Sequence, residues 1–305
     1  MKVIITGANS AVGQAILRRE TAPGEKAKAL VAAVRSTRAA EQIRSLRGDV
    51  NGIVQISYEE PGSLDAAFDG ASAIIHLAGV LVETPDSTYE RANVASTRSV
   101  VEAAKRRSVS KLVLVSATGA DENSSNRYYR TKGEAERLVR NSGLCYTVLR
   151  APLLLGPGTA GAAALARNLS GPKAKLIDAG RNLQQPLHVD DLAYAALTST
   201  DKSVAKNRTL DIVGPASLSE RQLLERAAQL LGREIRVASV SKRLLRSVLT
   251  VRSYFGMRGF SRDALDVVTA DTQLNPQLAA SQLGIQLTGI DQMIRDSLGQ
   301  GTKHE

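Results

Sequence analysis

A tyrosine and a lysine in the stretch YYRTKGEAERLV have the spacing for acid–base chemistry. Tyr128 and Lys132 are four residues apart, so on a helix their side chains share one face. A free phenol has a pKa of about 10, and a nearby ammonium group lowers that pKa because it favours the phenolate. Such a tyrosine can donate a proton to a carbonyl that is being reduced, or accept one from an alcohol. Tyr129 has Gly133 four residues on, so the spacing selects Tyr128.

A second polar group for the same substrate oxygen comes from the stretch VSATGA. It ends a predicted strand over 111–117 and carries the hydroxyls of Ser116 and Thr118. In an open parallel sheet, ligands bind beyond the carboxyl ends of the strands. Ser116, or alternatively Thr118, is therefore placed to polarise the oxygen that Tyr128 would protonate.

The N-terminal stretch TGANSAVG is typical of a phosphate-binding turn between a strand over 3–6 and a following helix. Gly7 permits a tight turn, and Gly13 lets the helix approach the sheet. Ser10 stands where a further glycine is expected, but it is small and its hydroxyl can donate to a phosphate. The alternative is an ordinary strand–helix turn. Backbone N–H groups at the helix N-terminus attract a pyrophosphate, and here they belong to Asn9, Ser10, Ala11 and Val12.

An arginine at the end of the second predicted strand favours one dinucleotide over another. The strand over 28–35 ends at Arg35, with Arg38 nearby. An acidic residue at this place binds the ribose 2′-hydroxyl of NAD, whereas an arginine pairs with a 2′-phosphate. The sequence therefore favours NADP(H) over NAD(H), and the alternative is a solvated surface arginine.

The elements that must position these residues alternate between apolar runs and helical patterns. Continuous apolar strands separated by helices predict a parallel sheet that is covered on both faces. After GPG at 156–158 the connections lengthen, and a helix is expected over 217–232. We therefore expect an α/β fold, with a Rossmann-type doubly wound parallel sheet over 1–158 and a smaller C-terminal α/β lobe over 159–305 that is interleaved with it. The predicted strands lie at 3–6, 28–35, 53–57, 72–79, 111–117 and 145–151.

Composition narrows the class of protein and its partners. The chain has 305 residues, of which 43% are hydrophobic, and no apolar run approaches the length of about 18 that a membrane span needs. The net charge of +10 suits anionic partners. No nucleic acid is expected, because the chain carries no helix-turn-helix, zinc or RNA-binding motif. The absence of a signal peptide predicts a cytoplasmic protein.

Four stretches, taken in order, resemble the short-chain dehydrogenase/reductase superfamily: TGANSAVG, HLAG at 76–79, VSATGA and YYRTK. RAPLLLGPG at 150–158, PLHVDDLA at 186–193 and the helix over 217–232 are similar to the extended and atypical branches of that superfamily. Those branches include the NAD-dependent epimerase/dehydratase group and the 39-kilodalton accessory subunit of respiratory complex I. The resemblance covers residues 1–235 well and the remainder loosely.

The resemblance implies roles for individual residues. Tyr128 would be the acid/base group, Lys132 its helper and a ligand of the cofactor ribose, and Ser116 or Thr118 the partner of the carbonyl. Ser57 occupies the end of the third strand, where the family often has an aspartate that binds adenine. The cofactor near the nicotinamide ribose would be lined by Leu77, Ala78 and Gly79.

These observations predict an NADP(H)-binding, reductase-like oxidoreductase that acts on a small-molecule carbonyl or alcohol. One alternative is a nucleotide-sugar epimerase or dehydratase that uses the same tyrosine. Another is a non-catalytic NADP(H)-binding subunit of a membrane-associated complex. Basic and apolar residues alternate over 240–262, so this segment could contact a membrane surface or a protein complex, or could simply cover the substrate cleft. His188 beside Asp190 and Asp191 is interpreted as structural, and no metal site is expected.

Overall fold

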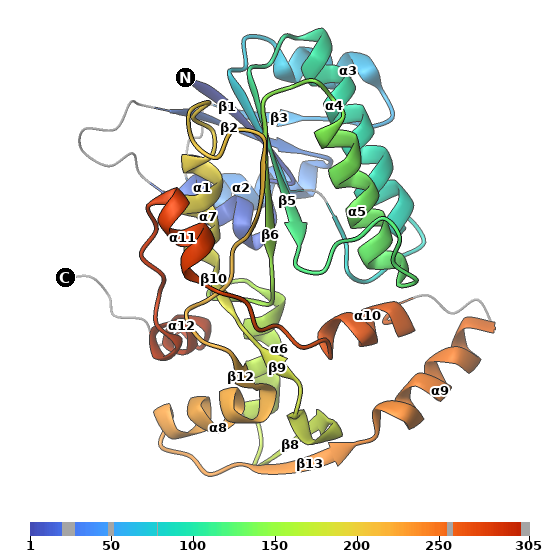
Figure 1. Cartoon of the computed structure of the whole chain (residues 1–305), viewed down its shortest axis with the longest axis vertical. Coiled ribbons are helices and arrows are strands. Elements are labelled where there is room, and N and C mark those ends of the chain that lie inside the picture. The colour runs from blue at the N-terminus through green and yellow to red at the C-terminus, as the bar shows by residue number, and fades with distance from the viewer. Residues whose placement is uncertain (20–27, 48–51, 78, 255–258, 300–305) are drawn as a thin grey trace.

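We describe the chain from a computed structural model, which defines residues 1–19, 28–47, 52–77, 79–254 and 259–299. Figure 1 shows two parts: a sheet flanked by helices in the upper part, and a smaller lobe below it that is built from the C-terminal half of the chain.

A parallel sheet forms the centre of the fold, as the sequence predicts, and it has a seventh strand, β11, beyond the six predicted ones. Its strand order is β3-β2-β1-β4-β5-β6-β11. The inner strands are buried on both faces, because helices cover both sides, and this is why their sequences are continuously apolar. The strands are β1 (Lys2–Thr6), β2 (Ala29–Val34), β3 (Ile53–Gln55), β4 (Ala73–His76), β5 (Lys111–Ala117), β6 (Tyr146–Ala151) and β11 (Arg208–Asp211).

Two apolar layers attach the helices to the sheet. One layer holds α1 (Ala11–Arg18), α2 (Thr37–Arg47), α7 (Val189–Thr198) and α11 (Gln277–Leu283). The other layer holds α3 (Pro61–Phe68), α4 (Ser96–Arg106) and α5 (Arg127–Arg140). A π-helical turn, η1 (Glu90–Ala95), leads directly into α4. Because α7, α11 and β11 come from the C-terminal half, the chain returns to the sheet after building part of the lower lobe.

The strand order reverses between β1 and β4, which are neighbours although they are not consecutive in the chain. From this point the sheet extends in both directions. The helices that follow β1 and β4 therefore lie on opposite faces of the sheet. A crevice then opens beyond the carboxyl ends of the strands, and ligands of such folds bind there.

The lower lobe has its own apolar core beneath that crevice. Leu165, Leu223, Leu224 and Ile294 are buried in this core. The helix expected over 217–232 is α8 (Glu220–Leu230), which begins at a reciprocal capping box between Ser219 and Gln222. The other helices are α6 (Ala160–Leu169), α9 (Lys242–Tyr254), α10 (Arg262–Val268), α12 (Ile290–Ser297) and the short η2 (Asp178–Gly180).

Three two-stranded sheets complete the lobe. Strands β7 (Leu154–Leu155) and β10 (Leu187–His188) are paired in parallel, as are β8 (Lys173–Ile177) and β13 (Arg236–Val240). Strands β9 (Leu183–Gln184) and β12 (Leu218–Ser219) are antiparallel. The division of the chain at 158/159 stays a prediction from the sequence.

The turn between β1 and α1 depends on close backbone contact. A Cβ atom added to Gly13 would lie 2.4 Å from the carbonyl oxygen of Ala8, nearer than atoms can approach. Gly7 has a φ of 73°, a conformation that glycine adopts without steric cost. These two glycines therefore hold the first turn of α1 against the end of β1.

Replacing Gly13 by alanine should push α1 away from this turn. We expect the free energy of unfolding to fall by about 1–3 kcal/mol, as for other overpacked sites. The matched control is Gly62→Ala in α3, where no atom lies within 4 Å of the added methyl group, and we expect a change of at most about 1 kcal/mol there. Urea unfolding followed by circular dichroism measures both. Equal unfolding midpoints for the two variants would contradict the close contact.

Candidate functional site

Ser10 takes part in the phosphate-binding turn without needing the conformation of a glycine. Its φ of −69° is open to any residue, and it is the N-cap of α1. Its side-chain oxygen accepts a hydrogen bond of 3.1 Å from the backbone N–H of Gly13. The hydroxyl proton of Ser10 is left to donate outward. The residue that departs from the expected glycine pattern thus stabilises the helix start.

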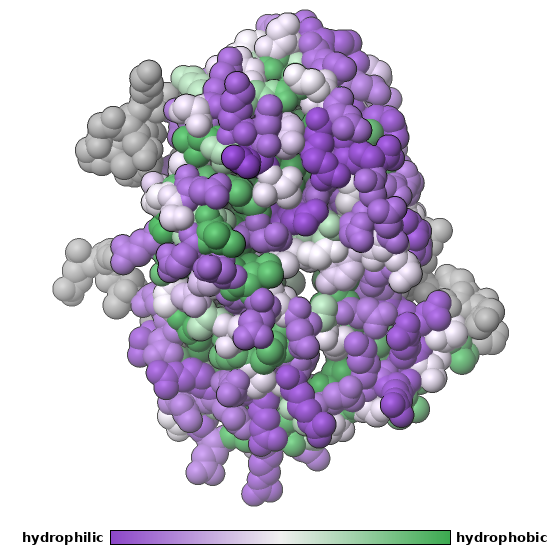
Figure 2. Space-filling model, viewed as in Figure 1, coloured by the Kyte–Doolittle hydropathy of each residue, from purple (hydrophilic) through white to green (hydrophobic). Residues whose placement is uncertain are grey.

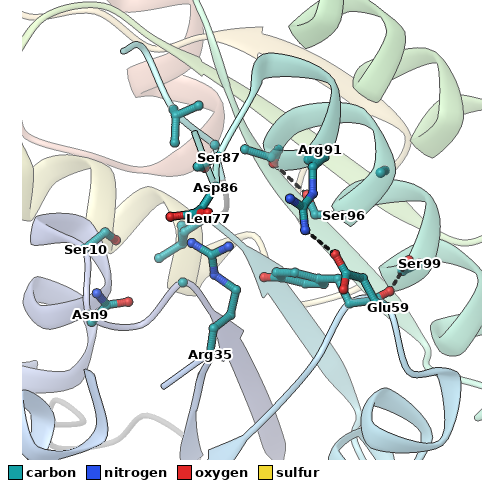
Figure 3. A pocket seen from close by; sticks show the side chains of 16 residues that line it. Asn9, Ser10, Arg35, Glu59, Leu77, Asp86, Ser87, Arg91, Ser96 and Ser99 are labelled. Carbon is teal, nitrogen blue, oxygen red and sulfur yellow. Dashed lines mark hydrogen bonds and ion pairs between the residues drawn. The ribbon is translucent and has the colours of Figure 1, made fainter. Parts of the chain in front are cut away.

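A pocket of about 280 Å³, here called the sheet groove, lies beyond the ends of β1, β2 and β4 (Figure 3). Gly7, Asn9, Ser10, Leu77 and Gly79 line it, so the structure brings these predicted residues together. The other predicted turn residues lie around it differently. Val12 lines the adjoining pocket described below, Ala11 and Gly13 build the first turn of α1, and Ala78 lies outside the described residues.

Arg35 supplies an unpaired positive charge to the sheet groove. It follows β2 directly, and its guanidinium extends into the groove in Figure 3. Within the described ranges it has no hydrogen bond or ion pair, whereas Arg91 across the groove is paired with Glu59. An unpaired guanidinium at the tip of the second strand can bind an anionic group bidentately.

The end of the third strand contributes Tyr58 where the sequence suggested Ser57. The Ser57 hydroxyl accepts a hydrogen bond from the N–H of Glu59 at 3.3 Å, and Ser57 is absent from the groove lining. Tyr58 lines the groove, and its ring meets the His76 ring edge-on at 6.0 Å. Burial raises the pKa of Tyr58, so this phenol is neutral. In the sequence, only the position of Tyr58 directly after IVQIS could have indicated that it lines the groove.

Lys132 lies buried where α5 meets β5. Its ammonium donates a hydrogen bond of 3.0 Å to the carbonyl oxygen of Val115. Burial lowers the pKa of Lys132 to about 8, against a smaller opposing effect of Glu136. A Cβ atom on Gly79 would come within 3.4 Å of Lys132 Nζ and 3.0 Å of Asn93 Oδ1. The absence of a side chain at Gly79 therefore leaves space beside the ammonium.

Asn93 is a site residue that the sequence analysis did not identify. It sits in the π-helical turn η1, and unusual helical turns of this kind are frequent at functional sites. Its side chain accepts from the N–H of Val80 at 3.3 Å and donates to Thr131 Oγ1 at 3.0 Å. It thus joins the loop after β4 to α5. A buried polar residue on the inner face of an otherwise amphipathic helix was the available signal.

Tyr128 lies in the first turn of α5. The Asn126 side chain caps this helix by accepting from the N–H groups of Tyr128 and Tyr129. The Tyr128 ring packs against Tyr89 and Tyr129, with centroids 5.8 and 5.7 Å away.

The expected lowering of the Tyr128 pKa is wrong for this state of the protein. Burial raises that pKa, and the neighbouring phenols of Tyr129 and Tyr89 raise it further. The lysine one turn away does not reverse this, because its ammonium is directed at the carbonyl of Val115. Tyr128 is therefore a neutral, protonated phenol at neutral pH.

Two further pockets continue from the sheet groove. The junction pocket, of about 210 Å³, shares Ser10, Leu77 and Gly79 with the groove and is also lined by Ser116, Tyr128 and Lys132. The lobe cavity, of about 300 Å³, lies between the sheet and the lower lobe. Tyr128, Leu81, Ala151 and Pro152 line both of these pockets. The groove, the junction pocket and the cavity thus share walls in that order, and Tyr128 stands at the second shared wall.

The two candidate hydroxyls point to different pockets. Ser116 lines the junction pocket and Thr118 lines the lobe cavity. Ser116 Oγ and Thr118 Oγ1 are both buried without a hydrogen-bond partner. Buried polar atoms are normally satisfied, so these two fit a polar ligand. With the closely packed turn and the unpaired Arg35, they fit a dinucleotide and an oxygen-bearing substrate.

The segment PLHVDDLA has a structural role. His188 is buried and caps α7 by accepting from the N–H of Asp190 at 3.2 Å. Its other ring nitrogen faces Asp296 of α12 at 3.3 Å. Asp191 accepts from the N–H and the hydroxyl of Thr288, both at 2.8 Å. The segment therefore ties the sheet layer to the last helices. Across the described ranges, no group of three or more His, Cys, Asp or Glu residues could hold a metal ion.

The basic segment 240–262 contains the last residue of β13, all of α9 and the first residue of α10. Its residues 255–258 lie outside the residues that the structure describes. Lys242 and Arg246 of α9 are ion-paired with Asp266 of α10, at 3.6 and 3.5 Å. Leu244, Val248 and Val251 are exposed, and the lobe cavity is lined by α10 rather than by α9. A membrane or protein contact through this segment stays a prediction. None of the described helices is long and apolar enough to span a bilayer.

Curated proteins of several kinds are similar to this chain. An uncharacterized sugar epimerase, YhfK, of Bacillus subtilis is 28% identical over 220 residues, which is 70% of this chain and 94% of that protein. The mitochondrial NADH-ubiquinone oxidoreductase 40 kDa subunit of Neurospora crassa is 22% identical, over 67% of this chain and 54% of that protein. The ceramide reductase of Caulobacter vibrioides is 28% identical, over 51% of this chain and 47% of that protein. The chain thus spans about half the length of the last two.

Solved structures share the whole fold. MoeE5 in complex with UDP-glucose and NAD has a TM-score of 0.73 with this chain at 21% identity, and the match covers 98% of each chain. A family model described as NAD(P)H-binding matches residues 7–176, which is more than half of the chain. The sheet order, the glycine turn and this match lead to one conclusion: the chain belongs to the NAD(P)H-binding Rossmann-fold family, among the extended short-chain dehydrogenase/reductase-like proteins.

Proposed function

We propose that the protein is an NADP(H)-preferring oxidoreductase that interconverts a carbonyl compound and its alcohol. The observation that carries this proposal is the position of Tyr128 in the wall shared by the junction pocket and the lobe cavity. A nicotinamide in the junction pocket and a carbonyl group in the cavity would meet at this phenol.

The chain would hold the dinucleotide along the groove. The first turn of α1 would bind the pyrophosphate through its N–H groups, and Arg35 would pair with a 2′-phosphate. Lys132 would donate to the ribose beside Gly79, in addition to its bond with Val115. When bound, the reduced nicotinamide supplies a hydride to the carbonyl carbon and is itself oxidised.

Tyr128 would supply the proton for the reduced oxygen. Its raised pKa keeps the phenol protonated at neutral pH, and a protonated donor suits the direction of carbonyl reduction. Ser116 from the junction pocket, or Thr118 from the lobe cavity, would hydrogen-bond the same oxygen, since both hydroxyls are without a partner. The surrounding rings of Tyr89 and Tyr129 would keep water from the proton path.

The relatives support reduction and leave a second candidate. One relative is named as a ceramide reductase and another as a sugar epimerase. A nucleotide-sugar epimerase would use the same groove and the same phenol. A non-catalytic subunit, as suggested by the similarity to the 40 kDa subunit, would need the groove but not the phenol.

Replacing Tyr128 by phenylalanine separates the enzyme from the accessory subunit. We expect turnover to fall about 100- to 10,000-fold, because the proton donor is lost, while dinucleotide affinity changes by less than about twofold. Steady-state oxidation of NADPH and calorimetric titration measure the two quantities. The control is Tyr194→Phe on α7, whose ring packs under Arg19 away from the pockets. Unchanged turnover in Tyr128→Phe would refute the role of this phenol.

Replacing Arg35 by alanine tests the cofactor preference. We expect NADPH affinity to fall about 10- to 100-fold, the value of a charge-assisted hydrogen bond, with NADH affinity little changed. Arg44→Ala, at an exposed position of α2, should bind both dinucleotides as the wild type does. An equal loss of both affinities in Arg35→Ala would show that this side chain does not contact the 2′-phosphate.

The pKa of about 8 at Lys132 gives dinucleotide binding a pH dependence. Binding to the charged ammonium is strongest below that pH, so affinity should fall by up to about tenfold per pH unit as pH rises above it. Lys132→Met should bind more weakly at neutral pH and lack this fall. Lys105→Met, at an exposed position of α4, should follow the wild type. Calorimetric titrations between about pH 7 and 9.5 measure the dinucleotide affinity. If affinity changes with pH in the same way in the wild type and in Lys132→Met, Lys132 is not the group that titrates.

A further inference from the structure

The lobe cavity has a wall of one chemical kind. Residues from the ends of β5 and β6, from α6, from α8 and from α10 line it, and most of them are aliphatic. Leu155, Leu165, Leu223 and Leu224 belong both to this wall and to the buried core of the lobe. Figure 2 shows apolar surface bordering the hollow between the sheet layer and the lobe. A ligand that enters the cavity therefore meets hydrocarbon on most sides.

Polar residues are the minority of the cavity lining. Thr118 and Tyr128 mark the end at the sheet, beside the junction pocket. Asn168, Gln184 and Glu220 come from the lobe. The amide of Gln184 is already engaged, because it donates to the carbonyl of Val268 at 3.1 Å. The mainly aliphatic lining thus offers few hydrogen bonds to a ligand.

The charge of the cavity is unfavourable for an anion. Its described lining contains no lysine, arginine or histidine, and its one ionisable acid is Glu220. Burial raises the pKa of this carboxyl group, which has no ion-pair partner among the described residues. Burying an anion without a cation is costly, and a carboxylate nearby adds repulsion. A diphosphate group would find its cations in the sheet groove, not here.

We propose that the lobe cavity binds an uncharged, largely aliphatic ketone or secondary alcohol, with its oxygen at Tyr128 and Thr118 and its hydrocarbon tail between α6 and α8. This inference rests on the proposed oxidoreductase function and names its substrate class. The volume of about 300 Å³ is at the lower end of the range for small-molecule sites, about 300–1,000 Å³. Each buried methylene group raises affinity about fourfold, so tail length controls binding until the cavity is full.

A series of 2-alkanones tests this substrate class on the full chain. With saturating NADPH, kcat/KM should rise about fourfold per added methylene from 2-butanone to 2-octanone and then level off. UDP-glucose should neither be turned over nor compete with 2-octanone. Flat values along the series, or competition by UDP-glucose at lower concentration than by 2-octanone, would overturn the proposal.

Binding of the 2-alkanones to the Tyr128→Phe variant separates this inference from the proposed function. Ligand-observed NMR on the NADPH-loaded variant reports affinity in the absence of turnover. If the wild type shows no turnover, a rise in affinity with tail length in the variant still supports an apolar ligand. If affinity does not rise with tail length, the cavity does not bind an apolar ligand.

Filling the cavity tests where the hydrocarbon tail binds, and a neighbouring position on the same helix gives the matched control. Ala164 lines the cavity from α6, whereas its neighbour Ala163 is exposed on the outer side of that helix. Ala164→Phe should weaken 2-octanone binding at least about tenfold and leave 2-butanone within about twofold, because only the longer tail needs the occupied space. Ala163→Phe should bind both as the wild type does. Equal losses for both ketones in Ala164→Phe would place the tail elsewhere.

Discussion

The buried ammonium group of Lys132 is the interaction on which the candidate site depends. A charge in the interior must find an acceptor, and the nearest one is the carbonyl oxygen of Val115 at 3.0 Å. That bond fixes the first turns of α5 against the end of β5, so it sets the position of Tyr128 one turn earlier. Gly79 lies beside the same ammonium, since a Cβ atom added there would be 3.4 Å from Lys132 Nζ. Burial of this charge lowers the pKa of Lys132 to about 8.

A second buried charge holds the other half of α5. Glu136 is fully buried and accepts from Arg150 of β6 through two bonds of 2.8 and 2.6 Å, and from Arg140 at 3.1 Å. Lys132 therefore ties α5 to β5, and Glu136 ties it to β6. Two directional anchors on neighbouring strands leave the helix little freedom to rotate or slide. Tyr128 can then remain at the shared wall of the two pockets whether or not a ligand is bound.

Much of this arrangement follows from sequence alone, because it depends on local patterns. The glycine turn at 7–13, the alternation of apolar strands and helices, and the spacing of Tyr128 and Lys132 along one helix are all readable over short windows. The parts that were missed depend on contacts between distant segments. The role of Asn93 follows from the contacts that the loop after β4 and α5 make with it. The direction of the Tyr128 pKa depends on Tyr89, nearly forty positions away, and on how deeply both rings are buried. The lobe cavity likewise combines residues from β5 to α10.

Transfer of isotope from the cofactor tests the central claim most directly. The protein would be incubated with 2-octanone and NADPH that carries deuterium at both C4 positions of the nicotinamide, and the product alcohol analysed by mass spectrometry. The account predicts 2-octanol with one deuterium on its carbinol carbon. If the protein binds the dinucleotide but no labelled alcohol forms from any ketone in the series, the groove serves only to hold a cofactor, and the catalytic account is wrong.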